Sequence, residues 1–242
     1  MNRDIVTHEM KITAFARMLA EDKFMIPTFQ RDFVWEPEDI IRLWDSIYRF
    51  YPIGSILYWE TNIDLRIHRK LGGFVLPNGE DTLRRFKKWV YILDGQQRAT
   101  SLLVSLFGGQ GKVKESKSFD YTLYFDATNA TFFFAEAFNR RKRDVHPAFL
   151  IRLQDMIQWG SDCYESIACE PGFDRTIRNN LRRFNHVLTN YKVPMISLKG
   201  FDIPAVCDIF ERINQEGKGL KSIDIMIART FVNDACIVEE DF

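Results

Sequence analysis

The sequence predicts an α+β fold, and three observations support this class. Short apolar runs typical of buried strands alternate with longer segments whose apolar residues recur at helical spacing. A tight turn at Asp94-Gly95 joins a strand directly to a helix. A mainly helical stretch then separates this unit from a last strand and helix. With 242 residues, 46% hydrophobic and 27% charged, the chain can form one large core or two closely joined lobes.

The first clear helix is expected over residues 36–50. Pro37 suits the first turn of a helix, and the acidic residues after it suit the positive end of the helix dipole. After a YPIG turn, residues 55–59 are short and continuously apolar, which predicts a buried strand. Residues 60–88 are interpreted as a polar excursion that contains several turns.

A strand–turn–helix unit occupies the centre of the sequence. Residues 89–93 form an apolar run typical of a strand, and Asp94-Gly95 provides the turn. From Gln96 onward apolar residues recur at helical spacing, and a pair of glycines is expected to end the helix. The strand therefore leads into the helix through only two residues.

The rest of the chain predicts a hairpin, a helical region and a closing strand–helix pair. The expected elements are, in order, strands over 121–125 and 131–135, helices within 136–190, a strand over 193–198, a helix from Ile203 to Asn214 and a helix from Ser222. The predicted division of the chain is a core over residues 1–135, a helical subdomain over 136–190 and a segment over 191–242 that completes the core.

The turn at residue 94 has the chemistry of an anion site. A helix N-terminus leaves backbone N–H groups unpaired and carries about half a positive charge. Gly95 lets a phosphate approach the backbone, and Arg98 can donate hydrogen bonds to phosphate oxygens. Asp94 can hold a metal ion or cap the helix. The alternative is structural: an aspartate cap beside an exposed arginine.

Two adjacent glutamines begin the same helix. Gln96 and Gln97 offer amide donors and acceptors that suit a phosphate, a sugar or a base edge. Two amides at a helix start are harder to explain as structure than a single capping residue, so both are candidate ligand contacts.

Two further stretches combine unusual residues. In IPTFQRDFVW, aromatic residues surround the polar pair Gln30-Arg31, and aromatic-rich extended segments are usually core. In FERIN, a helix end can present polar side chains to a metal–phosphate ligand, with a polar helix cap as the alternative. The candidate side chains in this second stretch are Glu211, Arg212 and Asn214.

Several enzyme classes lack their motifs in this sequence. There is no GxxxxGK[ST], HExxH or GxSxG pattern, and no His-Asn-His cluster of the kind that a metal-dependent nuclease needs. The glycine-rich run at 108–112 follows a helix instead of preceding one, so it is interpreted as a helix end. The four cysteines and four histidines have no zinc-site spacing, and the cysteines are expected to be small buried hydrophobes.

Lys and Arg together number 33, as do Asp and Glu, so no global positive field draws the chain onto DNA. Local candidates for DNA contact exist, with solvated surface as the alternative. They are Arg140, Arg141, Lys142 and Arg143, and a helix face formed by Arg175, Arg178 and Arg182. No apolar run approaches the length of a membrane span, so we expect a cytoplasmic protein.

Four motifs, in this order, resemble the N-terminal domain of GmrSD-type, modification-dependent restriction enzymes. They are IPTFQRDFVW, YPIGSILYWE, YILDGQQRATSL and FERINQEGKGLKSIDI, and the resemblance runs from about residue 20 to residue 232. That family is similar in turn to the ParB and sulfiredoxin fold, which implies a mixed sheet with packed helices and a mainly helical insertion. Sulfiredoxins carry a reactive cysteine where this chain has Gln96, which argues against reductase activity.

The resemblance implies a pocket for a nucleoside triphosphate with Mg²⁺, and hydrolysis coupled to DNA restriction or phage defence. The catalytic candidates by motif position are Asp94 and Arg98. The candidate nucleotide contacts are Gln30, Arg31, Gly95, Gln96, Gln97, Thr100, Arg212 and Asn214. The candidate metal ligands are Asp94 and Glu211. The implied partners are the nucleotide, DNA that can carry a modification, and a nuclease domain or subunit.

Three functions are compatible with these residues. The first is a magnesium-dependent NTPase, in which Arg98, Arg31 and the metal offset transition-state charge. The second is a nucleotide-gated DNA-binding module without turnover. The third is a ParB-like nuclease that nicks DNA itself.

Overall fold

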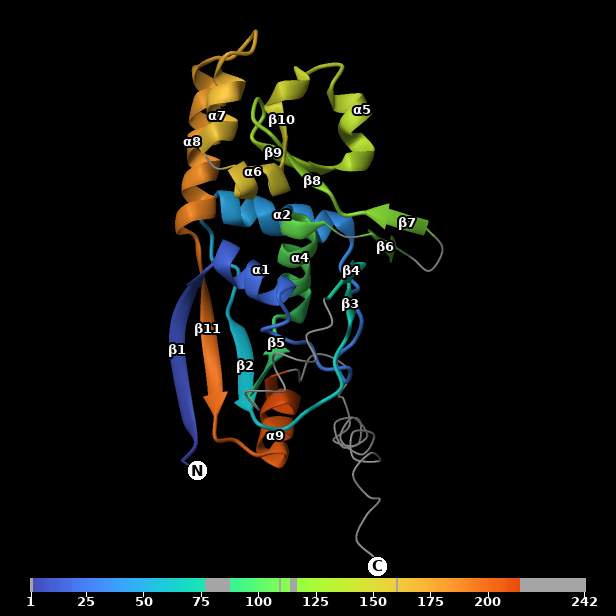
Figure 1. The fold of residues 1–242 in the computed structure, drawn as a ribbon, viewed down its shortest axis with the longest axis vertical. Helices are drawn as coiled ribbons and strands as arrows, with labels where there is room; N and C mark the ends of the chain where they lie inside the picture. Colours follow the sequence, from blue (N-terminus) through green and yellow to red (C-terminus); the bar gives the residue numbers. More distant parts are fainter. Residues whose placement is uncertain (1, 77–87, 109, 114–116, 160, 214–242) are drawn as a thin grey trace, which may run out of the picture.

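The computed structural model describes residues 2–76, 88–108, 110–113, 117–159 and 161–213. Its main sheet has four strands in the order β1-β11-β2-β5 (Figure 1). The strands are β1 (Asp4–Lys11), β2 (Ile56–Thr61), β5 (Trp89–Asp94) and β11 (Lys192–Lys199). β11 runs parallel to β2 and antiparallel to β1, and β2 runs antiparallel to β5. The sheet is therefore mixed, and the α+β class is confirmed.

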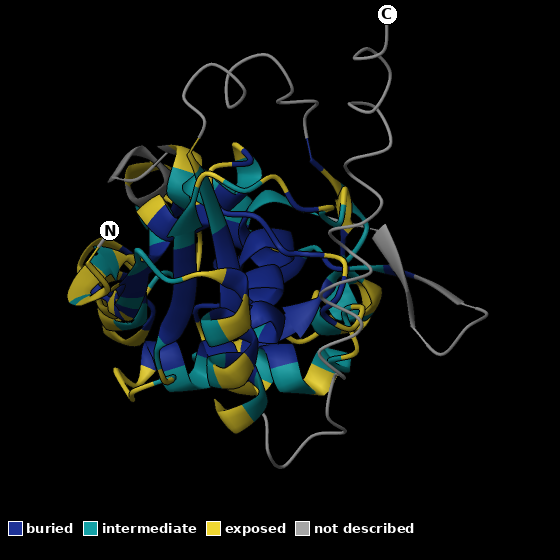
Figure 2. Ribbon diagram, turned by 90° about the horizontal axis from the view of Figure 1, so that it is seen from below, coloured by how far each residue is buried: buried dark blue, intermediate teal, exposed yellow. Residues whose placement is uncertain are grey.

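β2 and β5 are buried on both faces of the sheet, each face against different helices. On one face lie α1 (Ile12–Ala20) and α4 (Gln96–Phe107), which pack against each other and against Tyr58 and Ile92. On the other face lies α9 (Ile203–Ile213), which shares a smaller core with Trp59 and Tyr91. Figure 2 shows the buried residues concentrated in these central elements. Burial on both sides explains why β2 is continuously apolar in sequence.

A second layer continues from the helices on the α4 side (Figure 1). Its sheet has the order β10-β8-β9 and contains the predicted hairpin. The strands are β8 (Leu123–Asp126), β9 (Thr131–Phe134) and β10 (Leu150–Arg152). The helices are α2 (Pro37–Tyr48), α5 (Phe138–Arg141), α6 (Leu153–Trp159), α7 (Ser161–Ala168) and α8 (Arg175–Asn190), with 3₁₀ turns at Ala135–Ala137 and Pro147–Phe149.

Aromatic side chains join α2, the small sheet and α8. The Phe125 and Phe184 ring centroids are 4.5 Å apart. Trp44, Tyr48 and Phe132 complete the cluster. Such contacts bury large apolar areas, so this cluster fixes where α8 lies relative to α2.

Two short hairpins lie at the border between the layers. One consists of β3 (Lys70–Leu71) and β4 (Phe74–Val75), and the other of β6 (Gln110–Val113) and β7 (Lys117–Asp120). The expected polar excursion over residues 60–88 thus contains structure, since Leu65, Leu71 and Leu76 are buried.

The helices and strands expected from sequence are observed close to their expected bounds. Neither β1 nor α1 was predicted from the sequence, and β10 was not predicted within the helical stretch. β10 pairs with β8, which precedes residue 135. The division of the chain at residues 135 and 190 stays a prediction, and the helix expected from Ser222 lies outside the described residues. No helix among the described residues is long and apolar enough to cross a membrane.

One buried charge lies between α1 and the first short hairpin. Asp22 is fully buried in a left-handed conformation, with a φ of 58°, and its Oδ2 accepts a hydrogen bond from Arg69 Nη1 at 2.6 Å. Burial raises the pKa of Asp22 above its ordinary value, and the nearby guanidinium of Arg69 partly offsets this effect. The ion pair therefore links the hairpin to the end of α1.

We expect Arg69→Met to lower the free energy of unfolding by about 2–3 kcal/mol at pH 7, because a buried carboxylate loses its partly exposed counter-charge. A raised folded-state pKa means that ionisation of Asp22 disfavours the fold as the pH rises. The difference between the wild type and the variant therefore shrinks as the pH falls and Asp22 becomes neutral. Urea unfolding at pH 7 and at pH 4.5 measures both values.

Arg152→Met is the matched control, because Arg152 and Asp155 form a more exposed ion pair at 2.7 Å. Arg152→Met should lower the free energy of unfolding by less than about 1 kcal/mol at either pH. If Arg69→Met lowers the free energy of unfolding equally at both pH values, the charge of Asp22 is not the cause of the destabilisation.

Candidate functional site

The turn between β5 and α4 depends on a glycine. Gly95 has a φ of 89° and is the N-cap of α4. A Cβ at this position would lie 2.4 Å from Ile56 Cδ1, on the neighbouring strand. Both the backbone conformation and the lack of space favour glycine. The start of α4, with its N–H groups that have no partner within the helix, is thereby held against the end of the sheet.

Arg98 links this turn to the YPIG turn that precedes β2. Its Nη1 donates to the carbonyl of Ile53 at 2.6 Å, and its Nη2 lies 3.4 Å from Asp94 Oδ2. The guanidinium lies so close to Gly54 that a Cβ there would be 2.2 Å from Nη1. The Arg98 side chain is 19% exposed and that of Asp94 is 39% exposed. Arg98 thus has a structural role, and its remaining N–H donors are compatible with the predicted ligand contact.

The two glutamines bind the main chain of the first motif. Gln96 Nε2 donates to the carbonyl of Arg31 at 2.6 Å. Gln97 Nε2 donates to the carbonyl of Asp32 at 3.1 Å, and its Oε1 accepts from Val34 N at 2.9 Å. Both glutamines are buried. These bonds give the amides the structural explanation that sequence reasoning did not find, and ligand contact by either residue stays a prediction.

Gln30 connects the same segment to β5. It is buried, and its Nε2 donates to the carbonyl of Ile92. The Gln30 carbonyl contacts His68 Nε2 at 3.0 Å. Arg31 and Asp32, which follow, are exposed. Arg31 therefore projects from a segment that hydrogen bonds fix beside the first turn of α4.

The third motif meets the first through an aromatic contact. Phe210 on α9 lies edge-on to Phe29, with ring centroids 5.6 Å apart. Arg212 is exposed and pairs with Asp208 on its own helix at 2.9 Å, and Glu211 is half-buried. Asn214 lies outside the described residues. The structure brings the motifs together, while the contact of Arg212 with a ligand stays a prediction.

Thr100 lies in the interior. It is fully buried one turn into α4, and its Oγ1 has no hydrogen-bond partner in the described part of the chain. Its methyl group faces Gly72, where a Cβ would lie 3.3 Å away. Because Thr100 is fully buried, a nucleotide contact by this residue would require neighbouring residues to move.

Asp94 is the candidate metal ligand at the turn. Mg²⁺ is often held by one or two carboxylates together with substrate phosphates and water, so a single accessible carboxylate fits this use. Among the residues that the structure describes, no group of three or more His, Cys, Asp or Glu residues could hold a metal ion. The pairing of Asp94 with Glu211 as ligands stays a prediction.

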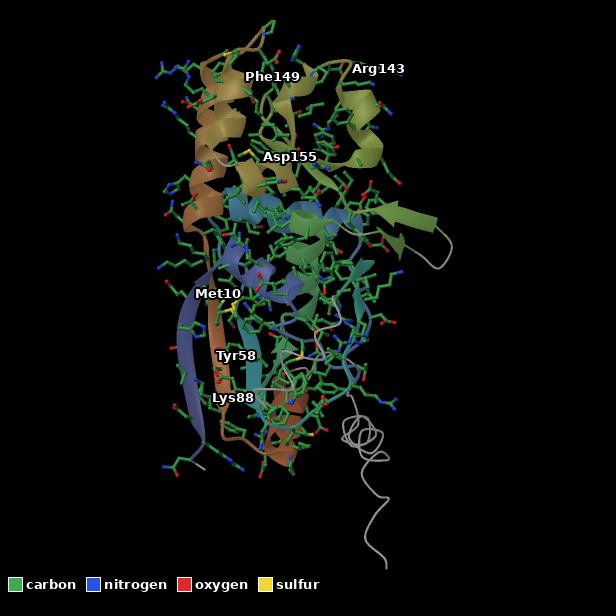
Figure 3. All side chains as sticks on the ribbon, in the orientation of Figure 1. Met10, Tyr58, Lys88, Arg143, Phe149 and Asp155 are labelled. Atoms are coloured by element: carbon green, nitrogen blue, oxygen red, sulfur yellow. The ribbon has the colours of Figure 1, made fainter. Side chains whose placement is uncertain are left out.

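The basic run at 140–143 lies far from this turn. Figure 3 shows Arg143 at one end of the molecule, whereas Tyr58 of the main sheet lies in the other half. Arg141 pairs with the fully buried Asp126 at 3.0 Å and covers the Phe133 ring. Arg140, Lys142 and Arg143 are exposed. One of the four cations thus stabilises the β8–β9 turn.

Sequence reasoning missed two contributors to the site. Gly54 gives space to the Arg98 guanidinium, and His68 supports the carbonyl of Gln30. Gly54 lies in a recognised turn, but its partner is distant in sequence. His68 is an isolated histidine that no local pattern distinguishes.

These features define an α+β domain in which a strand–glycine–helix turn is held to an arginine-bearing segment. Residues 15–231 match the model of the family described as GmrSD restriction endonuclease, N-terminal domain. The chain belongs to this family. It is also 25% identical over 261 residues to a protein of Methanocaldococcus jannaschii that is described as uncharacterised. That alignment covers 93% of this chain and 42% of the relative, so the chain spans less than half of that protein's length.

Gln97→Met should lower the free energy of unfolding by about 1–3 kcal/mol, because it leaves main-chain groups of residues 32–34 without their partners while keeping similar volume. Gln97→Glu keeps the acceptor for Val34 but sets a buried carboxylate against the Asp32 carbonyl, so at pH 7 it should lower the free energy of unfolding at least as much. Urea unfolding measures both variants, and a loss below about 0.5 kcal/mol in Gln97→Met would show that the bonds to residues 32–34 are unimportant.

Gly95→Ala should destabilise the fold more than Gly172→Ala. Both glycines have left-handed backbones, with φ values of 89° and 86°, but a Cβ at Gly172 would meet only Phe149 Cε2 at an ordinary 3.7 Å. We expect Gly172→Ala to lower the free energy of unfolding by about 1 kcal/mol because of backbone strain. Gly95→Ala should lower it by about 1–2 kcal/mol more because of overpacking. Equal thermal unfolding midpoints would contradict the close packing at the turn.

Proposed function

We propose that this chain is a nucleoside-triphosphate-binding and hydrolysing regulatory domain of a DNA restriction system that acts in phage defence on modified DNA. The observation that supports the proposal is that the first turn of α4, which also carries Arg98, binds the main chain at Arg31. Gln96 joins these parts, because it begins α4 and donates to the Arg31 carbonyl at 2.6 Å. Two guanidinium groups and a helix N-terminus form a setting that favours a polyphosphate.

Arg31 suits the outer part of the site. Its side chain is exposed, whereas its backbone is held by the Gln96 bond, so the guanidinium can turn toward a phosphate without a change in the main chain. Arg98 suits the inner part, since it is mostly buried beside Gly54 and Gly95. A ligand phosphate at the start of α4 would thus receive donors from two sides.

Hydrolysis requires a positioned water and compensation of the charge on the transferred phosphoryl group. Bound Mg²⁺ supplies electrostatic stabilisation of the phosphate oxygens. In our proposal Asp94 holds the metal, and Arg98 then turns part of its guanidinium from the carboxylate to the phosphate. Arg31 offsets charge that develops in the transition state.

The restriction context comes from the family to which the chain belongs. The description of this family is GmrSD restriction endonuclease, N-terminal domain. We propose that DNA cleavage is performed by a nuclease domain or subunit outside these 242 residues, and that nucleotide turnover in this domain controls it.

One observation favours a second function, a nucleotide-gated module without turnover. Asp94 and Arg98 lie 3.4 Å apart and can neutralise each other, which would leave no separate carboxylate for a metal. In that case nucleotide binding alone would change the state of the domain.

We expect Arg31→Ala to reduce phosphate release by about 100-fold or more, because it removes a charged donor to the transition state. Its fold should be unchanged, since the Gln96 bond uses only the Arg31 carbonyl. Arg42→Ala is the matched control, because it removes the same charge from an exposed position on α2 that pairs with Asp39. The purified chain is incubated with Mg²⁺ and each of the four nucleoside triphosphates, and phosphate release and binding are measured together.

Turnover lost in Arg31→Ala and retained in Arg42→Ala supports the NTPase. Binding without phosphate release in the wild type supports the gated module instead. If the wild type neither binds nor hydrolyses any of the four nucleotides, both functions are wrong for this chain.

A further inference from the structure

The exposed side of α8 carries positive charge that nearby residues do not neutralise. Residues 175–201 contain no Asp or Glu. Arg175, Arg178 and Arg182 are exposed, and within the described residues none of the three forms an ion pair. The carboxylate of Asp174 precedes the helix, but it caps α8 by accepting from Ile177 N at 2.8 Å.

Several exposed arginines elsewhere on the described surface are paired with neighbouring carboxylates. The pairs are Arg3 with Asp202, Arg49 with Asp45, Arg152 with Asp155 and Arg212 with Asp208. The cations at the start and end of β11 are also paired, Lys192 with Glu9 and Lys199 with Glu60. Arg17, Arg31, Arg140 and Arg143 are also exposed without an ion pair among the described residues, so α8 differs in carrying three such arginines on one helix face.

The cations of α8 form one stripe. At 3.6 residues per turn, Arg175, Arg178, Arg182 and His186 fall within an arc of about 80°. The opposite side of the helix is buried, at Ile177, Leu181, Phe184 and Leu188. Arg175 and Arg182 are about 10 Å apart along the helix axis, so the stripe can contact successive phosphates of one strand. Figure 3 shows side chains that end in nitrogen projecting outward along this helix.

An exposed aromatic residue lies at the end of the stripe. Phe50, just after α2, is 48% exposed, and its ring lies 5.8 Å from that of His186. Its φ of 64° is a left-handed conformation that a bulky side chain rarely adopts. The neighbouring Tyr51 is 55% exposed. A large ring held half-exposed in a strained backbone indicates a use at the surface.

Contacts with the C-terminal end of α8 hold Phe50 in place. Arg183 Nε donates to the carbonyl of Tyr48 at 3.2 Å, and Tyr191 Oη donates to the carbonyl of Tyr51 at 2.6 Å. The Phe50 and Tyr191 ring centroids are 5.3 Å apart. The position of Phe50 relative to the cationic stripe is thus fixed on both sides of the residue.

We propose that this surface, formed by Arg175, Arg178, Arg182, His186 and Phe50, binds DNA. The arginines contact the sugar–phosphate backbone, and the Phe50 ring stacks on a base that is not paired. The inference goes beyond the proposed nucleotide site, because it concerns a different surface. The two proposals share only the idea that the domain acts on DNA. The inference places the contact on α8, because this stripe lies beside an exposed aromatic ring, whereas Arg141 in the 140–143 run is bound to Asp126.

The test measures the affinity of the chain for a fluorescent 20-nucleotide single strand and for the matching duplex. Fluorescence anisotropy gives both affinities, without nucleoside triphosphate and at several salt concentrations. Arg175→Gln/Arg178→Gln/Arg182→Gln should weaken binding to both DNA forms by about tenfold or more at 0.1 M salt, and reduce the slope of log affinity against log salt by about 2–3. The matched control is Arg3→Gln/Arg49→Gln/Arg152→Gln, which removes the same charge from ion-paired positions and should have a much smaller effect. Equal losses in the two triple variants would overturn the assignment of the stripe.

Phe50→Gly tests the ring separately. Glycine suits the left-handed backbone, so the fold should be retained, which thermal unfolding checks, with Phe50→Asn as a second tolerated variant. Single-strand affinity should fall about fivefold or more while duplex affinity changes little. Unchanged single-strand affinity in both variants would overturn the stacking role. Because no nucleotide is present, failure here is distinct from failure of the proposed NTPase.

Discussion

The amide side chains of Gln96 and Gln97 bind the main chain of residues 31–34, and the candidate site depends on these bonds. They fix a segment without regular structure to the first turn of a helix. Arg31 can then lie beside a helix N-terminus although the two are far apart in sequence. Since every partner is a main-chain group, the bonds fix the path of the segment and leave its side chains available for other contacts.

The two-sided burial of β2 and β5 has a related effect. Alternate residues of these strands belong to different cores, one shared with α4 and the other with α9. Gly95 follows β5 directly and approaches Ile56 of β2. The turn is therefore sensitive to packing on both faces of the sheet, and a shift of α9 has a direct physical connection to the start of α4 through the strands between them.

Much of the fold was predictable because its signals are local. Apolar spacing predicted α2, α4 and α9, and continuous apolar runs predicted β2 and β5. β1 was not predictable, since it is an edge strand with most residues exposed and no clear alternation. In the site, sequence indicated the turn, Arg98 and Arg31. It could not reveal that the glutamines bind residues 31–34, or that Arg98 binds Ile53, because these partners are brought together only by the sheet.

The place of β11 in the main sheet also has a consequence for how the chain is made. β1 and β2 come early in the sequence, yet β11, residues 192–199, lies between them. Until the ribosome has synthesised this late strand, the earlier two cannot join into one sheet, and their edges remain available to other chains. The newly made N-terminal half thus exposes strand edges, and β1 and β2 become parts of one sheet only when β11 is inserted between them.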